Sequence, residues 1–303
     1  MLDTAIIVRG LRKAYDAVEA VRGIDLQVQR GEVFALLGPN GAGKTTTVEI
    51  LEGHRDRDAG EVTVLGHDPE RGERALRERI GIVLQSTGVE PYLTVEETLQ
   101  QFRGYYPAPR PLDEILEVVG LIEQRGQRVR RLSGGQRRRL DVAVGLAGDP
   151  DLLFLDEPTT GFDPAARRQA WDLVRNLRSL GKTILLTTHY MDEAEQLADR
   201  IAILVAGEIV AEGKPDDLIR RDETSTIRFR LPSGVANLLE AIPGEIALEG
   251  DAVTIRTPRP TVVLQLLTTR ATEGGIELDD LTVTHATLED IYLRLTAGQV
   301  GAD

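Results

Sequence analysis

The chain has 303 residues, of which 41 % are hydrophobic and 28 % charged, a composition typical of a globular protein with about two domains and a sizeable core. It contains no cysteine, which excludes disulfides and thiolate metal sites. The formal net charge of −13 opposes binding to a phosphodiester backbone or to anionic lipid, so we expect no nucleic-acid partner.

Neither the N-terminal segment nor the apolar runs indicate membrane insertion. Residues 1–8 lack a basic flank followed by an apolar core, so no signal peptide is expected. The run 201–206 is far shorter than the roughly 18 residues that span a bilayer. We expect a soluble, cytoplasmic chain whose role at a membrane would require a partner polypeptide.

The first 222 residues alternate β-like and helical runs. Strands are expected at residues 5–8, 24–28, 33–37, 61–65, 80–84, 152–155, 183–187, 201–204 and 208–211. Helices are expected at residues 45–51, 95–103, 113–119, 135–146, 165–179 and 191–197. Short apolar strands separated by helices predict an α/β domain with a mostly parallel sheet covered on both faces. The early β-rich stretch predicts an antiparallel appendage on that sheet.

After a polar stretch at residues 213–222, a second series of strand-like and helical segments begins. Strands are expected at residues 226–231, 245–248, 253–256 and 276–283, and helices at 235–241, 261–271 and 287–295. The order βαββαβ predicts a small α+β module of the ferredoxin-like kind. We therefore expect two domains, 1–222 and 223–303, of which the second has no phosphate loop and no concentrated set of catalytic residue types.

A glycine-rich loop at residues 38–45 lies between the apolar run 33–37 and a helix-like segment. Strand, glycine loop and helix in this order are the context of a phosphate-binding loop. The glycines let backbone N–H groups converge on phosphate oxygens, and the helix N-terminus adds partial positive charge. Lys44 would reach the β- and γ-phosphates, and Thr45 would hold Mg²⁺. The residues expected to contact a nucleoside triphosphate are Gly38, Asn40, Gly41, Ala42, Gly43, Lys44, Thr45 and Thr46.

A phosphate loop alone is compatible with a kinase, a GTPase, a helicase or a transporter motor, and residues 152–157 narrow the choice. They form an apolar strand that ends in two carboxylates, Asp156 and Glu157. Asp156 would approach Mg²⁺ through a water, and Glu157 would polarise the attacking water as general base. A buried strand that ends in an acidic turn is the alternative, which the neighbouring phosphate loop disfavours.

A second candidate anion site is the sequence Leu-Ser-Gly-Gly-Gln at residues 132–136, ahead of the helix expected at 135–146. Ser133 is a good N-cap residue, and Gly134 and Gly135 expose backbone N–H groups. A capped helix without a ligand is the usual meaning of such a sequence. This helix terminus could not easily face the same phosphate as the first loop, and it would more naturally serve a second copy of the chain.

Together these motifs resemble the nucleotide-binding subunits of the ATP-binding-cassette (ABC) transporter superfamily. The resemblance covers residues 5 to about 220, and Leu-Ser-Gly-Gly-Gln matches the signature sequence of that family letter for letter. It assigns Tyr15 to stacking on adenine and Gln85 to contact with Mg²⁺ and the membrane partner. It assigns His189 to the switch that touches the γ-phosphate, and Asp163 to the loop that crosses the dimer interface.

The resemblance implies a P-loop NTPase cassette with a helical signature subdomain, acting as an ATPase with ATP and Mg²⁺. Two copies would dimerise head to tail, with ATP between the phosphate loop of one chain and residues 133–136 of the other. Closing and opening would drive a separately encoded membrane permease, which would hold the chain at the cytoplasmic face of the cell membrane. The implied catalytic residues are Lys44, Glu157 and His189; the implied metal ligands are Thr45, Gln85 and Asp156; the implied trans contacts are Ser133, Gly134, Gly135, Gln136 and Asp163.

Residues 159–161, 190–195 and 287–293 resemble the drug-export (daunorubicin-resistance-like) branch of this family, in which the C-terminal module would be regulatory or dimer-stabilising. Phe162 stands where the family usually has leucine. Two alternatives remain: a non-transport ATPase of the same superfamily, acting in translation or DNA maintenance, and an ATP-sensing regulator. A single cassette without room for a long coiled coil disfavours the first, and the intact catalytic residues disfavour the second.

Six arginines surround the signature sequence. A nucleic-acid surface is one interpretation of this cluster, but the overall acidity favours a solvated helix face and loop. These residues are Arg128, Arg130, Arg131, Arg137, Arg138 and Arg139.

Overall fold

The computed structural model describes residues 4–83, 88–220, 224–231, 236–285 and 287–297. The chain divides into two compact units, Met1–Pro215 and Asp216–Asp303. This division lies close to residue 222, and the assignment of separate roles to two domains remains a prediction.

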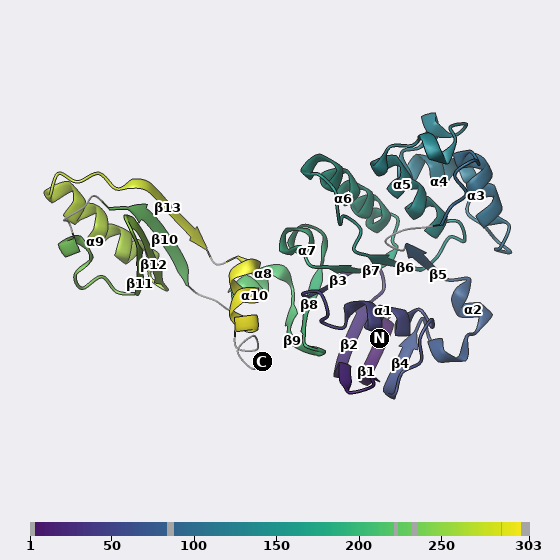
Figure 1. Ribbon diagram of the computed structural model, residues 1–303, viewed down its shortest axis with the longest axis horizontal. Coiled ribbons are helices and arrows are strands. Elements are labelled where there is room, and N and C mark those ends of the chain that lie inside the picture. Colours follow the sequence, from purple (N-terminus) through teal and green to yellow (C-terminus); the bar gives the residue numbers. More distant parts are fainter. Residues whose placement is uncertain (1–3, 84–87, 221–223, 232–235, 286, 298–303) are drawn as a thin grey trace. The chain divides into compact units, whose positions relative to one another are not determined.

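The first unit contains two sheets (Figure 1). An antiparallel sheet has the order β2-β1-β4, with strands β1 (Thr4–Tyr15), β2 (Val18–Gln29) and β4 (Ala59–Val64). A second sheet has the order β5-β6-β7-β3-β8-β9, with strands β3 (Val33–Leu37), β5 (Ile80–Val83), β6 (Leu152–Asp156), β7 (Thr183–Thr188), β8 (Arg200–Val205) and β9 (Glu208–Gly213). Neighbouring strands from β5 to β8 in this order are parallel to each other. The mostly parallel sheet and its antiparallel appendage are therefore confirmed.

Two details of these strands go beyond the prediction. The last strand, β9, is antiparallel to β8, because only Ala206 and Gly207 connect them and a parallel crossover needs a dozen or more residues. Both connecting residues have positive φ, of 48° and 83°, as a tight hairpin turn requires. The strands β1 and β2 are each twelve residues long and exceed the predicted ranges, since their pairing continues through several register shifts.

The predicted helices of the first unit are found close to their expected ranges, as α1 (Lys44–Leu51), α3 (Val95–Arg103), α4 (Leu112–Val119), α5 (Gly134–Gly145), α6 (Pro164–Ser179) and α7 (Met191–Leu197). The short helix α2 (Arg74–Arg77) and the 3₁₀ helices η1 (Pro69–Arg71), η2 (Ile122–Gln124) and η3 (Val129–Arg131) were not predicted. Helix α8 (Pro215–Arg220) begins at the last residue of the first unit and continues into the second. The start of α3 is fixed by a capping box between Thr94 and Glu97. Helices α3, α4 and α5 pack on one another and form the predicted helical subdomain.

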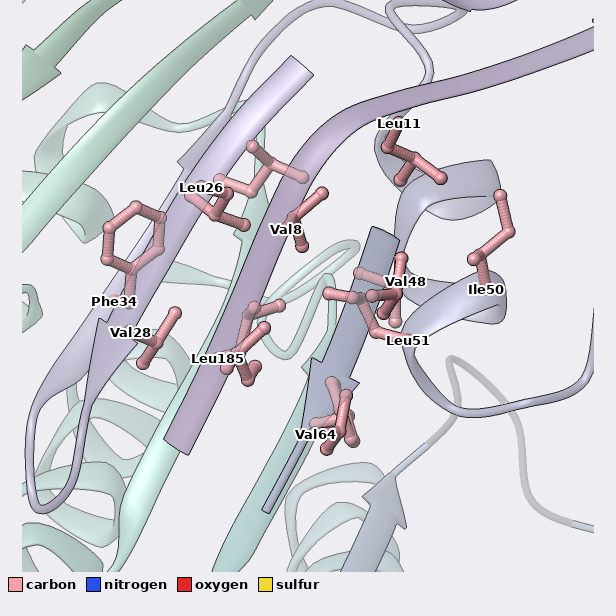
Figure 2. Close-up of a cluster of buried hydrophobic side chains, with 14 of the residues drawn as sticks. Val8, Leu11, Leu26, Val28, Phe34, Val48, Ile50, Leu51, Val64 and Leu185 are labelled. Atoms are coloured by element: carbon pink, nitrogen blue, oxygen red, sulfur yellow. The ribbon is translucent and has the colours of Figure 1, made fainter. Parts of the chain in front are cut away.

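The core of the first unit joins the antiparallel sheet to α1 and to the parallel sheet. Figure 2 shows Val8 of β1 between Leu26 of β2 and the α1 residues Val48 and Leu51, with Phe34 of β3 nearby. These side chains are all less than 5 % exposed. Burying each large apolar side chain contributes about 1.5–3 kcal/mol. The packing therefore fixes α1, and with it the phosphate loop, against both sheets.

The second unit is a four-stranded antiparallel sheet in the order β11-β12-β10-β13. Its elements are β10 (Ser225–Arg230), η4 (Ala236–Leu239), β11 (Glu245–Glu249), β12 (Ala252–Thr257), α9 (Pro260–Glu273), β13 (Asp279–His285) and α10 (Leu288–Ala297). Its own core includes Phe229, Ile255 and Leu267. The small α+β module of antiparallel strands and helices is thus confirmed.

Two details of the second unit differ from the prediction. The α-helix expected at residues 235–241 is wrong, because its described part is the short 3₁₀ helix η4. The last strand begins at Asp279 rather than at Ile276, because the Ile276 N–H donates to the carbonyl of Ala271 at 2.8 Å and closes the end of α9. Ile276 and Leu278 instead pack against the core of this unit.

Candidate functional site

The phosphate loop occupies the turn between β3 and α1, as the sequence predicts. Gly43 has φ 101°, and a Cβ there would lie 2.2 Å from the Ala20 carbonyl oxygen. A Cβ on Gly38 would lie 2.2 Å from the Leu204 carbonyl oxygen. Backbone therefore approaches the loop closely at both ends, and only glycine fits. Glycine at these two positions therefore lets the loop pack against the backbone of Ala20 and Leu204.

Lys44 opens α1 and folds back over this loop. Its Nζ donates to the carbonyl oxygens of Gly38 at 2.7 Å and Pro39 at 3.0 Å, and the residue is only 5 % exposed. Burial lowers the pKa of Lys44, while Glu157 and Asp156 oppose that shift. Thr45 is exposed and Thr46 half-buried at the same helix terminus. An ammonium held at a helix N-terminus beside glycine N–H groups is the donor set that a polyphosphate requires.

The carboxyl ends of β6, β7 and β3 meet because these strands are neighbours. Parallel pairing places Asp156 of β6 opposite Thr187 of β7, and Thr188 opposite Leu37 of β3. The Glu157 carboxylate follows β6 and is central: its Oε1 lies 3.7 Å from Lys44 Nζ. The predicted catalytic residues thus converge from three separate parts of the sequence, since His189 follows β7.

The Glu157 side chain is surrounded by donors. Its Oε1 lies 3.4 Å from Nδ1 of His189, and its Oε2 accepts a hydrogen bond from the Thr160 hydroxyl at 3.0 Å. The backbone of Glu157 has φ 44°, which is uncommon for a residue with a side chain. Its N–H donates to the Thr187 carbonyl at 3.2 Å and to Thr187 Oγ1 at 3.0 Å. The surrounding hydrogen bonds hold a strained turn that aims this carboxylate.

Sequence reasoning missed the role of Thr187. Its hydroxyl donates to Oδ1 of Asp156 at 2.5 Å and accepts from the Glu157 N–H, so it fixes both acidic residues. The sequence gives Thr160 no role beyond a family resemblance, although its hydroxyl donates to the Glu157 carboxylate. The strand register that brings Thr187 opposite Asp156 carries no signal in the sequence alone.

The signature segment forms a capped helix terminus. Ser133 Oγ accepts from the Gln136 N–H at 3.2 Å, and Gln136 Oε1 accepts from the Ser133 N–H at 2.9 Å. Ser133 and Gly134 are exposed. Ser133, Gly135 and Gln136 line an open groove of about 500 Å³ beside η2. Among the described residues, the lining of this groove includes none from the phosphate loop.

Three further predicted residues have different outcomes. Tyr15 ends β1 at 37 % exposure, with the Arg55 guanidinium 5.1 Å and Lys13 Nζ 5.8 Å from its ring centre. Asp163 is the N-cap of α6, where its Oδ1 accepts from two backbone N–H groups at 2.9 and 2.8 Å. Gln85 lies outside the described residues. The roles of Tyr15, Asp163 and Gln85 toward nucleotide and metal remain predictions.

One arginine of the signature region is not solvated. Arg128, Arg130, Arg131 and Arg137 are exposed, in agreement with the solvated face predicted for the cluster. Arg138, however, is only 8 % exposed, so the prediction is wrong for this residue. The helical period explains the difference, because Arg138 falls on the face of α5 that packs toward β6.

Glu52 is a buried acid at the end of α1. Burial, followed by the negative charges of Asp156 and Glu49, raises the pKa of Glu52 to about 8. Its Oε2 lies 3.2 Å from Nδ1 of His54. The folded chain therefore keeps this proton across a pH range in which an unfolded chain has released it.

We expect Glu52→Gln to flatten the pH dependence of stability without nucleotide. Above pH 4.5 the unfolded chain loses this proton, whereas the folded chain keeps it to about pH 8. The free energy of unfolding therefore falls as pH rises through this interval, and glutamine removes that fall. The measurement is the difference in melting temperature between pH 5 and pH 8, in EDTA, for the variant and the wild type. Each kcal/mol of unfolding free energy corresponds to about 2–4 °C in melting temperature. The exposed Glu195→Gln is the control, and equal pH slopes in both variants would contradict the expectation.

The family models agree with the geometry of the site. Residues 21–160 match the model for ABC transporters. Residues 225–287 match the model described as the C-terminal domain of ABC transporter domain-containing protein-like sequences. Both the cassette and the small module therefore have counterparts in this family.

Similar proteins extend the match to the whole chain. The daunorubicin resistance ATP-binding protein DrrA3 of Streptomyces coeruleorubidus is 41 % identical, over 98 % of this chain and 97 % of its own length. The Nod factor export ATP-binding protein I of Ralstonia nicotianae is 40 % identical, over 97 % and 94 %. The solved dimeric structure of the bacterial ABC transporter cassette MJ0796 is 26 % identical, with a TM-score of 0.61 over 69 % of this chain and 98 % of that one.

The identity over nearly the full length of these relatives exceeds what a shared fold alone would give. ABC cassettes dimerise and pair with transmembrane permease subunits. Among the described residues, no helix has both the length and the apolar character that a membrane crossing requires. The chain belongs to the ABC transporter family as an ATP-binding subunit, and it is an ABC-type transporter ATPase.

Proposed function

We propose that this chain hydrolyses ATP between two of its copies and thereby drives an export permease. The observation that carries the proposal is the convergence of Lys44 and His189 on the Glu157 carboxylate at adjacent strand ends. The nearly full-length similarity to drug-resistance and Nod factor export proteins supports the export direction. The cargo would be a drug, an antibiotic or a lipid.

Within one chain, the phosphate loop and Lys44 would bind the β- and γ-phosphates. Glu157 would accept a proton from the attacking water, with its carboxylate held by Thr160 and its backbone by Thr187. His189 lies beside the same carboxylate and would contact the γ-phosphate. Thr45, Asp156 and Gln85 would hold Mg²⁺, which neutralises phosphate charge when it is bound. Tyr15 would stack on the adenine.

The second copy would complete the pocket. Ser133, Gly134 and Gly135 form a capped helix terminus, exposed at Ser133 and Gly134, that presents backbone N–H groups, and Gln136 closes its capping box. Asp163 lies at the start of α6, where it would face the dimer interface. The γ-phosphate would draw the two helix termini together, and its loss after hydrolysis would release them. A permease bound to both copies would change conformation as they close and open.

Export by the complete complex tests this function. A candidate permease, sought in the neighbouring open reading frame, would be expressed with this chain, and uptake of candidate drugs would be followed in everted membrane vesicles given ATP. Such vesicles expose the cytoplasmic face, where we place this subunit. ATP-dependent uptake that requires the permease supports the proposal. Binding of the chain to ribosomes or DNA with ATPase activity unaffected by the permease would instead favour a non-transport ATPase.

We propose that residues 223–303 stabilise or regulate the ATP-bound dimer. The module has its own sheet and core, which include Phe229 and Ile255, so its removal leaves the core of the cassette intact. A second contact between copies raises apparent affinity by about 10²-fold or more. A chain ending at Asp222 should therefore need about 10²-fold more protein to dimerise in ATP, as measured by analytical ultracentrifugation. Unchanged dimerisation, ATPase activity and transport would refute this role.

A further inference from the structure

Arg138 is the buried arginine of α5 that the solvated-face prediction misplaced. Its side chain is 9 % exposed, and Asp141 lies one helical turn along α5 at 3.9 Å. Burial lowers the pKa of Arg138, while the carboxylates of Asp141, Asp156 and Glu193 oppose that shift. These acids come from α5, β6 and α7, so the guanidinium is surrounded by negative charge from each of these elements and remains protonated.

The guanidinium binds the backbone on both sides of Glu157. Its Nε donates to the Pro158 carbonyl at 3.2 Å, and its Nη2 donates to the Asp156 carbonyl at 3.3 Å. One rigid fork thus spans the turn whose middle residue carries the expected general base. Thr187 of β7 also holds this turn, since its hydroxyl accepts from the Glu157 N–H and donates to the Asp156 carboxylate.

This clamp acts on a turn that would otherwise relax. Glu157 has φ 44°, a conformation that is unfavourable for a residue with a side chain and persists only where neighbours impose it. The direction of the Glu157 carboxylate depends on this backbone. A displacement of about 1 Å in a reacting group can cost about 10²-fold in rate.

We propose that Arg138 is a positioning residue for ATP hydrolysis, which ties the strained turn around Glu157 to the helix that begins with the signature sequence. The proposal rests on the proposed function, because Glu157 is the base that Arg138 would align. Arg138 itself would contact neither the nucleotide nor the attacking water. Its removal should reduce turnover and leave the binding of ATP nearly unchanged, since the phosphate loop and Lys44 are separate from it.

The test compares three variants of the full chain by steady-state ATPase kinetics. Arg138→Met should lower kcat by about 10²-fold, with KM for ATP within about threefold. Arg138→Lys restores one charged donor and should recover about tenfold of that loss, because an ammonium cannot span both carbonyls as a fork does. The matched control is Arg139→Met, the next residue of α5, which binds Gly120 O and Gln169 Oε1 away from this turn and should keep kcat within about threefold.

Three outcomes would overturn the proposal. A kcat in Arg138→Met that stays near the wild-type value would do so. Equal losses in Arg138→Met and Arg139→Met, with parallel falls in melting temperature, would show that Arg138 only stabilises α5. A rise in KM as large as the fall in kcat would place Arg138 in substrate binding. If Arg138→Met does not fold, the same criteria apply to Arg138→Lys.

A second measurement separates this proposal from the proposed function. A chain that carries both Glu157→Gln and Arg138→Met should still dimerise in saturating ATP. Replacing Arg138 leaves the phosphate loop and the signature terminus in place. Loss of that dimer only in the doubly substituted chain would overturn the positioning role. If Glu157→Gln alone stays monomeric, the two-copy pocket fails, whereas the kcat loss and lysine rescue in Arg138 variants would still support alignment of Glu157 within one chain.

Discussion

Glu157→Gln is expected to bind ATP, to lose at least about 10²-fold in kcat and to accumulate as an ATP-bound dimer, because a general base contributes about 10²–10⁴-fold to rate. Glutamine has the same shape and can keep the hydrogen bond that Glu157 Oε2 accepts from Thr160 at 3.0 Å. It removes a negative charge 3.7 Å from Lys44 Nζ, in the region where the γ-phosphate would bind. Binding should therefore be equal or tighter while the chemical step stalls.

The measurement is sedimentation velocity in saturating ATP and Mg²⁺, together with phosphate release. Glu195→Gln, an exposed acid of α7, is the matched control and should hydrolyse ATP like the wild type without a trapped dimer. A Glu157→Gln chain that stays monomeric at high protein concentration would count against the two-copy pocket. Near-normal phosphate release from it would count against Glu157 as the base.

Lys44→Ala is expected to lose the stabilisation that ATP gives the folded chain. A ligand at 100 times its Kd stabilises a protein by about 2.7 kcal/mol, which corresponds to roughly 5–10 °C in Tm for a unit of this size. In the variant this shift should nearly vanish, because no ammonium remains for the β- and γ-phosphates, and kcat should fall by at least about 10²-fold.

Melting without nucleotide is the internal reference for this variant. Lys44 Nζ donates to the carbonyls of Gly38 and Pro39, so its loss also weakens the empty loop, and only the ATP-induced difference in Tm reports on phosphate binding. Lys214→Ala removes an exposed lysine and should retain the full ATP shift. A normal ATP shift and near-normal hydrolysis in Lys44→Ala would reject the phosphate-loop assignment.

The motifs of the cassette could be predicted because each lies within a few consecutive residues. Two local patterns each indicate a chemical role. One is the order of strand, glycine loop and helix around Lys44, and the other is the apolar strand that ends in Asp156 and Glu157. The bounds of several helices could be predicted for the same reason, and α3 and α7 have the predicted bounds. The predicted helix at 235–241 failed because local pattern could not distinguish an α-helix from the short 3₁₀ helix η4.

By itself, the sequence determined the kind of chemistry: a phosphate loop, paired carboxylates and a second glycine-rich helix start, on a fold of parallel strands. Tertiary structure alone decided which side chains meet, because parallel pairing brings the ends of β6, β7 and β3 together from positions far apart in the chain. It also decided that Thr187 and Arg138 hold the turn at Glu157. Hydrogen bonds between distant residues depend on strand register and helix facing, which packing of the whole chain fixes and no local pattern records.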